Sequence, residues 1–171
     1  MDHQLTLNGN NCCLSSGLLT CAAAAETVHD TTVTIDYVLD GIIASKTAIT
    51  DGATPTTDYV TGAAFPPIVG GGSVAGAYGN GCIVLWGLIA GGTVKCIQGA
   101  QQALDVSGNF IVAPAMPNYP STFVPFAYQV LKAKATASAT AIVFGTANWN
   151  ATGFTNVIKN VMVLPVRPVV A

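Results

Sequence analysis

Residues 32–39 alternate between apolar and polar side chains with a period of two. The alternation assigns them to two faces, with Val33, Ile35, Tyr37 and Leu39 on one and Thr32, Thr34 and Asp36 on the other. This pattern predicts a strand with one buried face. Asp40-Gly41 follows, and then a second apolar segment, 42–47. The combination is typical of a β-hairpin, because both central residues of its tight turn need positive φ.

Other segments are apolar throughout. Residues 82–90 read CIVLWGLIA and are followed by Gly91-Gly92 and the apolar segment 93–97, which predicts two buried strands joined by a glycine turn. The first run is too short for a membrane-spanning helix, which needs about 20 residues. Further strands are expected at 110–112, 126–133, 140–144 and 154–164.

The remaining segments carry loop and turn signals. Residues 51–81 contain prolines and a glycine run from Gly70 to Gly81, and Asp105–Asn109 is typical of a turn. The best local helix signal is the alanine-rich stretch Cys21–Glu26 within 16–27, and 98–103 is a second, shorter candidate. An extended connection is marked by four prolines, Pro114, Pro117, Pro120 and Pro125.

Seven to nine short strands about ten residues apart, with no sustained helical period and no internal repeat, predict an all-β fold. We expect a single-domain β-sandwich, jelly-roll-like, with long Gly/Pro-rich loops and at most one short helix. Three parts are expected: an N-terminal segment, 1–30, that contacts neighbours, a sandwich core, 31–164, and an extended C-terminal tail, 165–171. The tail is expected to be extended because proline restricts both itself and the residue before it.

Charge is scarce in this chain. Charged residues make up 8% of its 171 residues and apolar residues 51%, whereas an ordinary soluble domain has about 25% charged residues. Such a composition excludes intrinsic disorder, and a net charge of −2 gives no electrostatic basis for binding nucleic acid. Because so few charges make a surface poorly soluble, we expect copies of the chain or a partner to cover much of it.

The few charges are unevenly distributed. Residues 1–105 carry all eight acids with Lys46 and Lys95, and sum to −6. Residues 106–171 carry no acid, and four bases give +4: Lys132, Lys134, Lys159 and Arg167. Either this asymmetry is chance in a charge-poor chain, or the acidic and basic parts meet, within one subunit or between neighbours.

Candidate chemical groups form no catalytic constellation. Cys12, Cys13 and Cys21 lack the C-x-x-C spacing of zinc sites. The N-terminus lacks a signal-peptide pattern, so we expect buried thiols that stay reduced in a cytoplasm. Gly71–Ala75 is only weakly similar to a nucleophile elbow, and no histidine follows His29. We expect no enzyme activity, cofactor, metal site or small-molecule substrate.

The second half of the chain combines several short motifs. They are, in order, the apolar segment Val84–Lys95 with its Gly-Gly turn, Gln98-Gly99, Ala103–Phe110, the prolines Pro114 and Pro117, Pro125–Val130, Phe144–Gly153 and the closing Leu164–Pro168. In combination they resemble a group of small virion proteins of tailed bacteriophages. The resemblance covers about half of the chain and implies a structural role on the capsid or in the tail.

From the resemblance and the composition together we expect a non-enzymatic capsid decoration or cement protein on the virion surface, synthesised in the host cytoplasm. Its expected partners are itself, as a homotrimer, and the major capsid protein, with no nucleic acid and no membrane. The contact arms are expected at Pro114–Pro125 and Leu164–Ala171. The expected interface residues are Pro114, Pro117, Tyr119, Pro120, Trp149, Leu164, Pro165, Arg167 and Pro168.

Three alternatives stay open at this stage. The first is a tail, collar or fibre component of the virion. The second is a carbohydrate-binding module for host attachment, in which aromatic rings such as Trp149, Tyr119 and Tyr78 would stack on sugars. The third is a pilus or filament subunit that polymerises head to tail.

Overall fold

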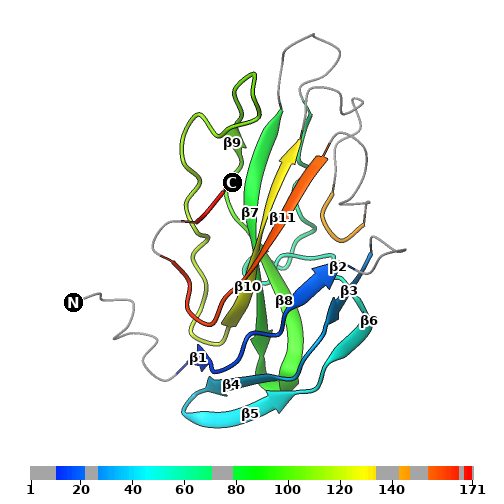
Figure 1. Cartoon of the computed structure of the whole chain (residues 1–171), viewed down its shortest axis with the longest axis vertical. Helices are drawn as coiled ribbons and strands as arrows, with labels where there is room; N and C mark the ends of the chain where they lie inside the picture. The colour runs from blue at the N-terminus through cyan, green and yellow to red at the C-terminus, as the bar shows by residue number, and fades with distance from the viewer. Residues whose placement is uncertain are drawn as a thin grey trace, which may run out of the picture.

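The computed structural model describes residues 11–21, 27–70, 79–133, 143–146, 154–165 and 168–170. Every pairing between the strands of this part is antiparallel (Figure 1). The all-β prediction is confirmed, and the sheets are consistent with a β-sandwich, while the jelly-roll topology stays a prediction. The elements are β1 (Cys12–Cys13), β2 (Leu19–Cys21), β3 (Val28–Thr31), β4 (Ile35–Leu39), β5 (Ile42–Lys46), β6 (Ile49–Ala53), β7 (Asn80–Ile89), the 3-10 turn η1 (Ala90–Gly92), β8 (Thr93–Gln98), β9 (Gln102–Ala103), β10 (Val124–Ala133) and β11 (Phe154–Asn160).

The largest sheet has the strand order β11-β10-β7-β8, and β9 pairs with the start of β7. Its long central strands, β7 and β10, are buried along almost their whole length. Strands that are covered on both faces tend to be apolar throughout instead of alternating, which explains the unbroken run at 82–90. The predicted glycine turn is confirmed, because Gly91 and Gly92 both take positive φ between β7 and β8.

Two smaller sheets, β1-β4-β5 and β2-β3-β6, pack against one face of the large sheet (Figure 1). In β4 the predicted alternation is confirmed, since Ile35, Tyr37 and Leu39 are buried. The predicted hairpin joins β4 to β5 through Asp40 and Gly41, whose φ values are 53° and 75°. Positive φ at both central residues matches the twist of the flanking strands.

Apolar side chains form one core on each face of the large sheet. The inner core lies between the large sheet and the small sheets, and there Trp86 and Leu88 of β7 pack with Ile35 and Tyr37 of β4. The outer core lies on the opposite face and has at its centre the buried side chains Ile83, Leu85, Ile97, Phe123, Tyr128 and Val130. No second sheet covers the outer core in the described part. Its cover comes from the proline-rich connection, through Met116 and Tyr119, and from the C-terminal segment, through Leu164 and Val170.

The two predicted helices are wrong wherever the structure describes them. Of the helix signal Cys21–Glu26 only Cys21 is described, and it ends strand β2, which pairs with β3. Residues 22–26 lie outside the described part. Within 98–103, Gln102 and Ala103 form β9 beside β7. A helix of so few residues is marginal by itself, so pairing with a neighbouring strand prevails. No helix in the described ranges is long and apolar enough to cross a membrane.

Several strand limits also differ from the predictions. Val33 is exposed and lies before β4, and Ile49–Ala53, partly expected as loop, is β6 paired with β3. Residues 110–112 form only a single bridge, Leu104 to Phe110. For β6, pairing with the non-adjacent strand β3 decides the outcome, and local composition does not report it.

Three further limits concern the ends of the predicted segments. The expected strand 154–164 ends at Asn160. Of 140–144 only residues 143 and 144 are described, and Val143 begins a turn in which its carbonyl accepts the Thr146 amide at 3.2 Å. The expected boundary at residue 30 falls inside β3, so the described part of the N-terminal segment belongs to the sheets.

Candidate functional site

His29 is the only described histidine and lies in the inner core. It points inward from β3, with 2% of its surface exposed, and its ring centroid is 4.9 Å from that of Trp86. Neither ring nitrogen has a hydrogen-bond partner in the described part of the chain. Burial lowers its pKa to about 4, against a smaller opposing effect of the nearby Asp30 carboxylate. The imidazole is therefore neutral near pH 7 and serves as a packing group.

Trp86 begins a short chain of side-chain hydrogen bonds that runs from the interior to half-buried Asn156. Its indole Nε1 donates to Oε1 of Gln129 at 3.0 Å, and Nε2 of Gln129 donates to Oδ1 of Asn156 at 2.7 Å. Gln129 is fully buried, so an unpaired amide there would cost about 1–3 kcal/mol of desolvation. The chain links three neighbouring strands, β7, β10 and β11, and explains why a glutamine is tolerated in this core.

The buried thiols are poor nucleophiles. Burial raises the pKa of Cys13 to about 11 and that of Cys82 to about 12, and it raises the pKa of Cys96 well above the ordinary value. Thiols in this state are protonated near pH 7 and pack as small apolar groups. The expectation of buried thiols is confirmed for these three and is wrong for Cys12, which is exposed.

Asp58 is a buried carboxylate with a structural role. Its Oδ1 accepts the amides of Val60 and Thr61 at 2.9 and 3.0 Å, and its Oδ2 accepts the amide of Gln98 at 2.8 Å. These bonds close a turn and fasten it to the end of β8. Among the described residues no group of three or more His, Cys, Asp or Glu side chains could hold a metal ion.

The predicted contact residues of the proline-rich connection pack on their own sheet. Pro114 is buried. Pro117 is half-buried and lies so close to Gly99 that a Cβ built there would stand 3.2 Å from its Cγ. The Tyr119 ring is half-buried, and its centroid is 5.9 Å from that of Phe123. Pro120 is exposed, and its carbonyl accepts the amide of Phe123.

The described part of the tail is fastened to the same face. The Tyr128 hydroxyl accepts the Val169 amide at 2.9 Å and donates to the Val169 carbonyl at 3.4 Å. Leu164 packs against the outer core, and Pro165 and Pro168 are half-buried. Tyr119 and Leu164 thus meet the same core, while Trp149, Arg167 and Tyr78 lie outside the described residues.

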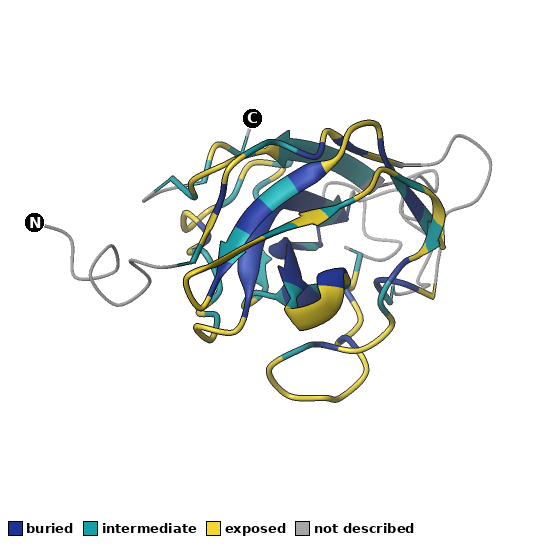
Figure 2. Cartoon of the chain, turned by 90° about the horizontal axis from the view of Figure 1, so that it is seen from below, coloured by how far each residue is buried: buried dark blue, intermediate teal, exposed yellow. Residues whose placement is uncertain are grey.

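The structure adds exposed aliphatic side chains that the sequence reasoning missed. Three pairs of consecutive residues stand out, each side chain 52–72% exposed: Ile42-Ile43, Ile111-Val112 and Met162-Val163. Figure 2 shows exposed residues along the β4–β5 hairpin and buried residues on the strands inside. For Ile42-Ile43 the sequence carries a signal of this exposure. Two consecutive residues of a strand point to opposite faces, so both isoleucines cannot face the same core, and β5 is the last strand of its sheet.

Comparison of the chain with known protein families, with curated proteins and with solved structures finds no match. The candidate site therefore rests on the geometry of the chain: Gln129 and Asp58 are hydrogen-bonded within the interior, and exposed aliphatic pairs lie on a surface with few charges.

Proposed function

We propose that this protein is a non-enzymatic structural component of a virion that decorates and cements the capsid shell. The observation that carries the proposal is the presence of three exposed aliphatic pairs, Ile42-Ile43, Ile111-Val112 and Met162-Val163, in a chain with 8% charged residues. We infer that each pair forms part of a contact site, because extended exposed apolar patches mark contacts between proteins.

Repetition makes such contacts effective. Apolar surface removed from water contributes about 25 cal/mol per Å², and a specific interface buries on the order of 1,000 Å² or more. Each contact can be modest, because a shell repeats it many times and reinforces itself. The proposed partners are further copies of this chain, as a homotrimer, and the major capsid protein. The virion is proposed as the location from the resemblance that the motifs in the second half of the chain suggest.

The decisive experiment is quantitative mass spectrometry of purified, DNA-filled particles from cells that express the gene. A fixed, high ratio of this protein to the major capsid protein supports capsid decoration. A fixed but very low copy number would replace this proposal with a tail, collar or fibre role. Absence from particles would refute a virion role altogether.

A binding assay tests the surface directly. The double variant Ile42→Ser, Ile43→Ser should bind more weakly than the natural protein to capsids that lack it. Val60→Ser is the control, because Val60 is also exposed but lies in a turn and belongs to none of the three aliphatic pairs. Equal binding by all three proteins would exclude the β4–β5 hairpin from the contact.

A further inference from the structure

We propose that the protein associates head to tail, with an aspartate-bearing face of one copy bound to a lysine-bearing face of the next. The inference deepens the proposed structural role and rests on its premise that copies of the chain lie in contact. It is carried by the positions of the charged side chains in the two layers of the sandwich.

The lysine face is defined by Lys95, Lys132 and Lys159 on the outer side of the large sheet. Lys132 Nζ lies 5.2 Å from the ring centroid of Phe110, which packs on the outer core. Lys159 is paired with Tyr128, and directly paired residues share a face of the sheet. Lys95 is paired with Gly87, where an added Cβ would meet the ring of Phe123 in the outer core.

The aspartate face is defined by Asp30, Asp36, Asp40 and Asp51 on the small sheets. Asp30 stands between the buried residues His29 and Thr31, and Asp36 stands between the buried residues Ile35 and Tyr37. Since successive side chains of a strand alternate between faces, both carboxylates point away from the core. Asp51 and Asp40 are exposed, the first beside Asp30, whose Oδ1 accepts the Asp51 amide.

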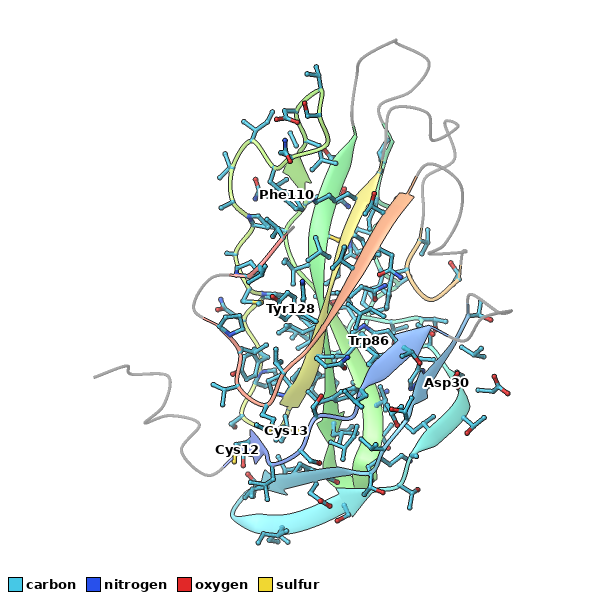
Figure 3. The ribbon with its side chains drawn as sticks, viewed as in Figure 1. Cys12, Cys13, Asp30, Trp86, Phe110 and Tyr128 are labelled. Atoms are coloured by element: carbon cyan, nitrogen blue, oxygen red, sulfur yellow. The ribbon has the colours of Figure 1, made fainter. Side chains whose placement is uncertain are left out.

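The two faces lie on opposite sides of the sandwich. In Figure 3, Asp30 is on the side of the small sheets, Phe110 and Tyr128 are on the other side, and Trp86 lies between them. The described acidic and basic side chains of these faces therefore cannot meet within one subunit. The remaining described charges reduce this polarity without reversing it. Asp58 is buried. Lys46, half-buried like the three lysines of the lysine face, lies in β5 of a small sheet, and Asp105 lies in the turn that leads to Phe110.

A second copy is the occupant that fits both faces at once. Each face combines one sign of charge with exposed aliphatic side chains, Ile43 on the aspartate side and Met162-Val163 beside the outer core. Contact between like faces would oppose like charges, which is unfavourable. Contact between unlike faces is heterologous, and such contacts build rings if the rotation closes and filaments if it does not.

Two neutralised variants of the whole chain test this arrangement. The first carries Asp30→Asn, Asp36→Asn, Asp40→Asn and Asp51→Asn, and retains the lysine face. The second carries Lys95→Gln, Lys132→Gln and Lys159→Gln, and retains the aspartate face. Asn keeps an oxygen that can accept the Asp51 amide and the Ser45 hydroxyl, and circular dichroism verifies the fold. Asp105→Asn is the control, because Asp105 is an acid that belongs to neither set of replaced residues.

Sedimentation velocity gives the readout. We expect the natural protein and the control to self-associate, about tenfold or more weakly in 0.5 M than in 0.05 M salt because screening acts on exposed charges. Each neutralised variant alone should stay monomeric, and an equimolar mixture should form 1:1 complexes through the one remaining pair of unlike faces. A monomeric natural protein, a variant that still self-associates, or a mixture without complexes overturns the inference. Presence on purified particles would then leave the virion role intact.

Discussion

The Asn160 side chain binds both backbone groups of Leu19, a residue 141 positions earlier in the chain. Its Oδ1 accepts the Leu19 amide at 2.6 Å, and its Nδ2 donates to the Leu19 carbonyl at 3.3 Å. Asn160 ends β11 of the large sheet, and Leu19 begins β2 of a small sheet. One carboxamide thus takes the place of a neighbouring strand and joins the two layers of the sandwich.

Replacing this carboxamide should loosen the contact between the layers. We expect Asn160→Ala to lower the free energy of unfolding by about 1–2 kcal/mol, the order of magnitude for two hydrogen bonds lost at a partly exposed site. Urea denaturation measures the change. The control is Asn118→Ala, because Asn118 is exposed in the proline-rich connection. Equal stability of the two variants would show that the Asn160 bridge contributes nothing.

The hydroxyl of Tyr128 should hold the C-terminal segment on the outer core. Tyr128→Phe keeps the buried ring and removes both bonds to Val169, so we expect a loss of about 1–2 kcal/mol. Hydrogen exchange should accelerate at Val169, whose amide loses its acceptor. Unchanged exchange there would contradict this arrangement.

Deletion of residues 166–171 separates two roles of the tail. If the tail serves only as a contact arm, the deletion lowers capsid binding and leaves the unfolding free energy unchanged. Since Val170 packs against the outer core, we expect the deletion to lower the unfolding free energy as well. Thermal unfolding of the truncated chain, beside that of Tyr128→Phe, measures this.

Gly87 has no room for a side chain. A Cβ built on it would lie 2.3 Å from the ring of Phe123, so we expect Gly87→Ala to cost about 1–3 kcal/mol through overpacking. Gly91→Ala is the comparison, because a Cβ at Gly91 meets nothing within 4 Å and only its φ of 77° is unfavourable. The double variant Gly87→Ala, Phe123→Leu should lose less unfolding free energy than the sum of the losses in the two single variants. Strict additivity would argue against the clash.

Stability should fall in acid because of His29. Its pKa is about 4 in the folded chain and 6.5 as the ordinary value, so the unfolded chain binds the proton more readily. The stability due to the neutral ring is fully present above about pH 6.5 and is lost progressively as the pH falls towards 4, by about 3 kcal/mol in total. Denaturation at several pH values measures the slope. His29→Phe should remove the contribution of His29 to this pH dependence. A variant whose stability changes with pH as in the natural protein would contradict the role given to His29.

Much of the fold could be predicted because strong local patterns agree with it. The alternation at 35–39, the Asp40-Gly41 turn and the apolar run at 82–90 all correspond to the observed strands and hairpin. The helix signal failed at Cys21, because a short local signal cannot report that this residue pairs with His29 of β3. The contact residues were least predictable: Tyr119 and Leu164 look like free arms in the sequence but cover the outer core of their own chain.

The sequence by itself determined the all-β class, the hairpin turn and the separation of acidic and basic residues along the chain, because these depend on side-chain period, backbone φ preference and composition. Only the tertiary structure decided which faces those residues occupy. It covers one face of the large sheet with small sheets and the other with the proline-rich connection and tail, and so places Asp30 and Lys159 on opposite sides. The physical reason is that burial of a two-sided apolar sheet requires cover from segments far apart in sequence.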